Sequence, residues 1–176
     1  MKSQMLRIAA FLLVGAAAAG SAASLDTAKI DQITGLKGKL NDREGVHKVS
    51  LPRADIKISV DGWQMPPFMG LTSWAAFKPG MKDNVMVMGD LVLMQDEVNP
   101  VMSAALDNGL DVTALHNHFL YDEPKVYFMH IAGEGGVERL ASGVRKALDK
   151  IKEVRAANPQ LATSFAVGAL PAASSI

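Results

Sequence analysis

The chain contains no cysteine among its 176 residues. It therefore cannot form a disulfide, ligate a metal through a thiolate, supply a thiol nucleophile or carry a lipid on a leading cysteine. Its stability must come from packing, and we expect any bound metal ion to be held by nitrogen and oxygen ligands.

An excess of charge of either sign is also lacking, because 18 basic and 18 acidic residues give a formal net charge of zero. Without residues 1–23, which include Lys2 and Arg7 but no acid, the counts become 16 and 18, a net charge of about −2. Nucleic-acid binding normally requires a clustered basic surface, so we expect no nucleic-acid partner.

Long hydrophobic runs are confined to the start of the chain. Residues 1–23 have basic residues first, then an apolar run at 8–19, then small residues, which is typical of a secretory signal peptide cleaved after Ala23 or Ala22. A membrane span needs about 20 apolar residues, and no later run reaches that length. We therefore expect a soluble exported protein, periplasmic or secreted, without an integral membrane segment after cleavage.

The remaining residues suit one domain at 24–157, followed by a poorly ordered Ala- and Ser-rich tail at 158–176. A short helix is predicted at 25–33. Alternation and turn residues predict short strands at 36–40, 46–51, 55–60 and 71–77. Residues 63–70 are expected to form an apolar loop that packs on the sheet.

The second half predicts longer elements. Residues 85–94 are apolar on both faces apart from Asp90, which is typical of a central strand covered on both sides, with Met86, Met88 and Met94 filling the core. A helix over 98–106, strands at 110–118 and 125–131, and a helix over 137–157 follow. This order predicts an α+β fold, a mostly antiparallel sheet with two main helices on one face.

Three of the four histidines fall between Leu115 and Ile131. Histidine is the commonest metal ligand and the usual acid or base near neutral pH. His116 and His118 are two residues apart, so on a strand they point to the same face. The structural alternative is that this pair ends a strand at the surface and that His130 is a hydrogen-bonded core residue.

Whether His130 joins the pair depends on the strand register. A tight turn centred between Tyr121 and Asp122 would leave His130 about 10 Å beyond His116. A longer connection, with residues 119–127 outside the ladder, would place His130 opposite His116 and His118 beside Phe128. Only the second arrangement makes a centre of three histidines easy to build.

Two carboxylates are candidates to complete a nitrogen and oxygen ligand set. These are Glu97 and Glu123. Each also has a structural explanation, since Glu97 is an acid at a helix N-terminus and Glu123 is a turn residue before Pro124.

Four segments of the second half are distinctive as strings. They are Met-Gly-Asp-Leu-Val-Leu at 88–93, Asp-Glu-Val-Asn-Pro-Val-Met at 96–102, Thr-Ala-Leu-His-Asn-His at 113–118 and Pro-Lys-Val-Tyr-Phe-Met-His at 124–130. These segments resemble the LppY/LpqO family of exported bacterial proteins. The likeness runs from about residue 25 to 151. The family has no established reaction, so the resemblance implies mainly that Glu97, His116, His118 and His130 form one constellation.

The first functional hypothesis is an exported protein that binds a divalent metal, zinc or copper, through His116, His118 and His130 with Glu97 or Glu123. An open coordination position would suit a metal-assisted hydrolase or lyase, and a closed ligand set would suit a carrier or a structural site.

Two other hypotheses remain. One is a metal-free cell-envelope module in which Trp63 or Trp74 lines a pocket for a sugar or peptide. The other is metal-free acid and base catalysis by His118 and Glu123. The sequence names no substrate, no catalytic residue and no oligomeric state.

Overall fold

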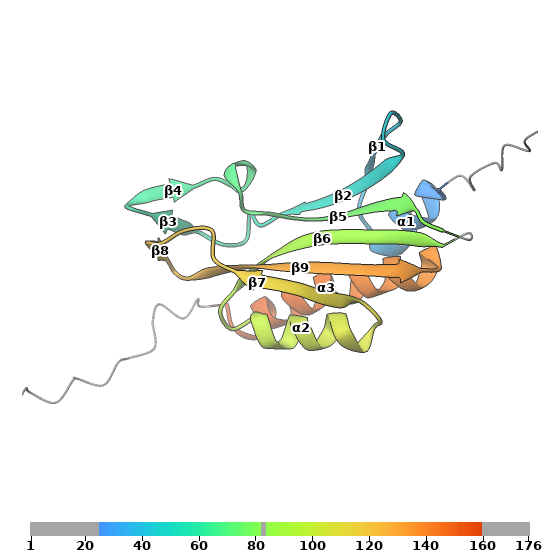
Figure 1. The fold of residues 1–176 in the computed structure, drawn as a ribbon. Coiled ribbons are helices and arrows are strands. Elements are labelled where there is room, and N and C mark those ends of the chain that lie inside the picture. The colour runs from blue at the N-terminus through green and yellow to red at the C-terminus, as the bar shows by residue number, and fades with distance from the viewer. Residues whose placement is uncertain (1–24, 82–83, 160–176) are drawn as a thin grey trace, which may run out of the picture.

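The structure is a computed structural model that describes residues 25–81 and 84–159. The predicted signal peptide and the tail from residue 160 lie outside the described residues. Helices cover one face of an antiparallel sheet, as Figure 1 shows, so the predicted α+β class with an antiparallel sheet is confirmed.

The main sheet has six strands in the order β1-β2-β5-β6-β9-β7, and every neighbouring pair is antiparallel. The strands are β1 Lys39–Asn41, β2 Val46–Pro52, β5 Thr72–Pro79, β6 Val85–Met94, β7 Asp111–His116 and β9 Val126–Gly135. The predicted bounds of β6 are confirmed, and β6 lies in the interior of the sheet.

A smaller sheet lies at one end of the main sheet, at the left of Figure 1. It has the order β4-β3-β8, with β3 Ile58–Val60, β4 Trp63–Met65 and β8 Asp122–Glu123. Its apolar side chains pack against the face of the main sheet that the helices do not cover. Together they form a second core of Ile56, Ile58, Leu71, Val92, Met94, Val126 and Phe128. This packing fixes the connection between β7 and β9 against the main sheet.

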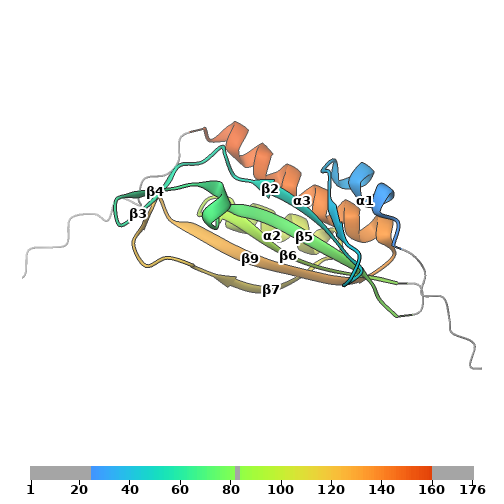
Figure 2. The ribbon, with the colours of Figure 1, turned by 90° about the horizontal axis from the view of Figure 1, so that it is seen from above.

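Three α-helices lie along one face of the main sheet, which Figure 2 shows from above. They are α1 Thr27–Thr34, α2 Val98–Asp107 and α3 Val137–Ala157. The apolar stripe of α3 recurs every three or four residues, and α3 contacts both other helices. No helix among residues 25–81 and 84–159 is long and apolar enough to cross a membrane.

The face of the main sheet opposite the helices is called the open face below. One expectation about the β6 residues on this face is wrong. Residues Leu91 to Met94 are buried on both faces as predicted. Met86 and Met88 are not core residues, because they are 47% and 58% exposed. The reason is that the helices cover one face only and the small sheet covers only the end of the other.

The apolar segment 63–70 also differs from its prediction. It forms β4 and a 3₁₀ turn, η1 Pro67–Met69. Trp63 is 77% exposed, Phe68 is fully exposed and Met69 is 63% exposed, so these side chains do not pack on the sheet. Pairing of β4 with β3 holds the segment beside the main sheet, where Met65 packs against the second core while Trp63, Phe68 and Met69 stay exposed.

Candidate functional site

The candidate site begins with a row of paired residues across the open face. Asp90 on β6 pairs with Trp74 on β5 and with His130 on β9, and His130 pairs with Ala114 on β7. Directly paired residues of an antiparallel sheet share a face. The row therefore places a carboxylate and an imidazole next to each other at the middle of the sheet.

His116, the last residue of β7, lies in the adjacent row. It pairs with Phe128, and a bulge between Val112 and Ala114 sets this register. His116 and His130 are thus diagonal neighbours, and their Nε2 atoms lie 3.0 Å apart. Neither predicted arrangement is observed. The connection is longer than a tight turn, but His130 pairs with Ala114 and not with His116, which is one residue from the tight-turn register and two from the other.

His118 follows β7 in the connection to β8. Its ring stacks on Phe128 with a centroid distance of 3.4 Å and an interplanar angle of 3°, and its centroid lies 5.1 Å from that of His116. Burial lowers the pKa of His118 below its ordinary value, against the opposing charge of Asp90, and the other two histidines lower it further. The pKa shift therefore favours the neutral imidazole, which is the form that ligates metals.

Asp90 is the residue that the sequence reasoning missed as a ligand. Its Oδ2 lies 3.9 Å from His130 Nε2, and its buried Oδ1 has no hydrogen-bond partner within the described residues. A buried carboxylate oxygen without a partner is costly, which points to a group that it binds. The available signal was that Asp90 is the one charged residue in the apolar strand 85–94.

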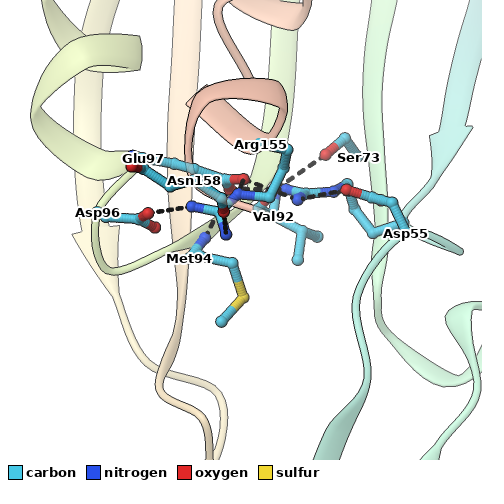
Figure 3. Close-up of polar contacts among 9 residues, drawn as sticks. Asp55, Ser73, Val92, Met94, Asp96, Glu97, Arg155 and Asn158 are labelled. Atoms are coloured by element: carbon cyan, nitrogen blue, oxygen red, sulfur yellow. Dashed lines mark hydrogen bonds and ion pairs between the residues drawn. The ribbon is translucent and has the colours of Figure 1, made fainter. Parts of the chain in front are cut away.

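Glu97 is not part of this cluster. It is fully buried, and Arg53 donates to both of its oxygens, from Nη1 to Oε2 at 2.8 Å and from Nη2 to Oε1 at 2.9 Å. The backbone N–H of Met94 also donates to Oε2, at 2.7 Å (Figure 3). Both carboxylate oxygens are therefore engaged, and the expectation that Glu97 lies with the histidines is not met.

Further charges complete a buried ionic network around Glu97, which Figure 3 shows between β2, α2 and α3. Arg155 Nε lies 2.6 Å from Glu97 Oε1 as an ion pair, without the alignment of a hydrogen bond, and Arg155 also pairs with Asp96. Burial alone would raise the pKa of Asp55, but hydrogen bonds from Arg53 lower it below the ordinary value. This network fastens the end of α3 to the start of α2, which is a structural role.

Glu123 contacts the small sheet and not the histidines among the described residues. It is exposed on β8, where it pairs with Ser59 of β3. Among the described residues, no hydrogen bond or ion pair joins Glu97 or Glu123 to the histidine cluster. The structure thus brings together His116, His118 and His130, and adds Asp90 instead of the two predicted glutamates.

The nitrogen and oxygen donors of Asp90 and the three histidines do not surround one point in the structure. In the part of the chain that the structure describes, no three His, Cys, Asp or Glu side chains are placed so that they could hold a metal ion. His118 is turned onto Phe128, and Asp90 is 3.9 Å from the nearest imidazole nitrogen. Three-ligand coordination would therefore require rotation of at least one of these side chains.

The chain matches the model of a family described as Domain of Unknown Function (DUF1259) over residues 28–150. This match covers more than half of the chain, so the protein belongs to that family. All four residues of the cluster lie within the matched region. No curated protein and no solved structure gives a significant match.

Proposed function

We propose that the protein binds a divalent transition-metal ion, zinc or copper, through His116, His118 and His130, with Asp90 as the oxygen donor in place of Glu97 or Glu123. The observation that carries the proposal is the 3.0 Å separation of His116 Nε2 and His130 Nε2 beside the unpartnered oxygen of Asp90. At this distance either one imidazole donates its Nε2–H to the other nitrogen or a cation lies between the two, because two lone pairs would repel.

The separation also suits adjacent ligands of one ion. With metal–nitrogen bonds of about 2.0–2.1 Å, two nitrogens 3.0 Å apart subtend roughly 95° at the metal. Asp90 supplies a negative charge on the same side, and a neutral His118 is available as a third imidazole after its ring turns away from Phe128. Three protein ligands leave a position for water or substrate, and four close the site.

Export and a closer relation to the LppY/LpqO proteins are part of the same proposal. The signal-peptide pattern of residues 1–23 supports export to the periplasm or medium. The string Ala-Leu-His-Asn-His at 114–118 supports the LppY/LpqO relation within the family of unknown function.

The test is metal stoichiometry by equilibrium dialysis of the purified protein against Zn²⁺ and, separately, Cu²⁺. We expect one ion per chain in the wild type and an affinity at least about tenfold lower in His116→Ala. Asp111→Asn is the matched control for Asp90→Asn, because exposed Asp111 pairs with Ala132 on the open face, one row away from Asp90. The control should bind as the wild type does, whereas Asp90→Asn should bind more weakly.

A fluorescence signal can be read from the same samples. The chain has two tryptophans, and Trp74 pairs with Asp90 on the open face, with Lys48 Nζ 4.0 Å from its ring centre. In a Trp63→Phe background, Cu²⁺ bound at the site should quench Trp74. The proposal is abandoned when neither ion binds stoichiometrically, or when His116→Ala binds as tightly as the wild type.

A metal-free module for a sugar or peptide of the cell envelope remains the second candidate. It is supported by the exposed aromatic side chains of Trp63, Phe68 and Tyr121 near the small sheet. This candidate predicts that chelators leave the melting temperature unchanged while envelope fragments raise it.

A further inference from the structure

Two lysines stand opposite each other at the edge of the main sheet, where Figure 1 shows β1 beside β2. Lys39 on β1 pairs directly with Lys48 on β2, so their Cβ atoms lie about 4.5–5.5 Å apart. Both side chains stand on the open face, because Lys48 also pairs with Ala76, which pairs with Met88. Like charges directly opposite each other destabilise a sheet, so this pairing requires an explanation.

Neither lysine has a carboxylate partner in the part of the chain that the structure describes, whereas Lys29, for example, pairs with Glu138. A lysine on an edge strand discourages pairing of that edge with other chains, which is sufficient to account for Lys39. This reason does not extend to Lys48, because β2 lies between β1 and β5. The positive charge of Lys48 therefore has no structural counterpart among the described residues.

An aromatic ring holds the ammonium group of Lys48. Its Nζ lies 4.0 Å from the centre of the Trp74 ring, which is a cation–π contact. Trp74 is half-buried on β5, where it pairs with Ser50. The contact fixes the position of the positive charge without neutralising it.

The lysine pair lines a cavity of about 770 Å³. Sites for small molecules are typically about 300–1,000 Å³, so this cavity has room for an organic ligand. It is formed by β1, β2 and the turn that joins them, and its lining comprises residues 39–44 with Val46, Lys48 and Ser50.

The charges that line this cavity are separated along the strands. Its two acids, Asp42 and Glu44, flank Arg43 in the exposed turn between β1 and β2. The pair of Asn41 and Val46 stands between this turn and the lysine pair, which places the turn at least roughly 7 Å away along the strands. The strand part of the cavity therefore has two positive charges and no acid.

A phosphate monoester matches two ammonium groups at this spacing. At neutral pH it carries a charge of about −1.5 to −2 and has three acceptor oxygens, so one group can accept hydrogen bonds from both lysines. A carboxylate has a single charge and would leave one ammonium group uncompensated.

We propose that this cavity binds a phosphate monoester, with the phosphate group held by Lys39 and Lys48 and the organic part in the remaining space. The inference does not rest on the proposed metal site, since none of the metal-ligand candidates lines the cavity.

The test is calorimetric titration of the protein with inorganic phosphate, at constant ionic strength and without added metal. We expect one site in the wild type and an affinity at least about tenfold lower in Lys39→Gln and in Lys48→Gln, because each loses a hydrogen bond between charged groups. Lys57→Gln is the matched control, since Lys57 is exposed beside the small sheet and does not line the cavity. It should bind as the wild type does.

Trp74 gives a second signal in the Trp63→Phe background. Phosphate should change the Trp74 fluorescence, because the ammonium group over the ring acquires a new partner. Lys48→Gln should abolish this change, and Lys57→Gln should keep it.

Vesicles distinguish a lipid headgroup from a soluble ligand. The protein is sedimented with phosphatidylcholine vesicles that contain or lack phosphatidic acid, whose headgroup is a phosphate monoester. Sedimentation that requires phosphatidic acid and is lost in Lys48→Gln would assign the site to a lipid. Phosphate binding without such sedimentation would assign it to a soluble compound.

The inference is overturned when neither inorganic phosphate nor phosphatidic acid binds saturably, or when both lysine variants bind as the wild type does. Acetate that binds as tightly as phosphate at the same ionic strength would overturn the assignment to phosphate. His116→Ala should bind phosphate normally, so failure of the proposed metal site would leave this site standing. Loss of phosphate binding in His116→Ala would place the anion at the histidines and contradict the inference.

Discussion

At the scale of single residues, two carboxylates show how differently a charged side chain is accommodated. Glu97 is fully buried with every oxygen engaged by Arg53, Arg155 or backbone. Asp90 keeps one buried oxygen without a partner among the described residues. The contacts of Glu97 account for its burial by a structural role, whereas the oxygen of Asp90 still requires a partner, which a bound water or ion can supply.

This contrast predicts that Glu97→Gln destabilises the fold without removing the metal site. The change leaves Arg53, which is 1% exposed, without its buried counter-charge, and we expect a loss of about 3–5 kcal/mol in the free energy of unfolding. Urea unfolding measures it. Exposed Glu123→Gln is the matched control and should stay within about 0.5 kcal/mol of the wild type.

Two results would contradict the structural role. One is an unfolding curve of Glu97→Gln that coincides with that of the wild type. The other is a folded Glu97→Gln protein that has lost its Zn²⁺, since this would make Glu97 a ligand.

At the scale of elements, β6 holds the candidate site in the sheet. Gly89 lies between Met88 and Asp90, and an added Cβ there would lie 2.6 Å from the carbonyl oxygen of Trp74 and 2.9 Å from Cγ1 of Ile131. Both distances are too short for carbon, and the first obstacle is backbone. The glycine therefore permits the close approach of β5 and β6 on which the Trp74–Asp90 pairing depends.

Gly89→Ala should accordingly lower the free energy of unfolding by about 1–3 kcal/mol through overpacking. Gly136→Ala is the control, because an added Cβ there meets no atom within 4 Å. Thermal unfolding followed by circular dichroism compares the two variants. Equal melting temperatures for both would show that β5 and β6 can move apart freely, contrary to the packing described.

At the scale of the whole molecule, α3 packs against both other helices and against β6 and β9 of the main sheet. The family match ends at residue 150, but α3 continues to Ala157 and contributes two further anchors. Ile151 is 2% exposed in the core, and Arg155 pairs with Asp96 and Glu97 at the start of α2. The stable unit therefore extends beyond the matched region.

Truncation after Lys150 should cost about 3–5 kcal/mol, because it removes buried Ile151 and the Arg155 charge that faces Glu97. Truncation after Pro159 keeps every contact described for residues 25–159 and serves as the control. Guanidinium unfolding of both proteins measures the difference. A protein ending at Lys150 that is as stable as the control would show that Ile151 and the ion pairs of Arg155 contribute nothing to stability.

The sequence by itself determined the fold class and the longer elements, whereas β4, η1 and β8 lie where a loop or turn is predicted. The strand 85–94 has the predicted bounds, α3 follows its apolar stripe, and the antiparallel sheet with helices on one face is as expected. The histidine cluster was also visible in the sequence, but β7 ends at His116, so His118 lies beside it through the following connection and not through the strand period. The longer elements are local features, and local periodicity encodes them.

Only the tertiary structure decided which side chains meet. The bulge in β7 sets His116 diagonal to His130, and the pairing of β6 with β9 brings in Asp90. Glu97 was drawn into an ionic network with Arg53, 44 residues earlier, and Met86 and Met88 stay exposed because no element among residues 25–81 and 84–159 covers that part of the open face. The physical reason is that register and layer coverage depend on contacts between segments distant in the chain, which a hydrophobic pattern does not contain.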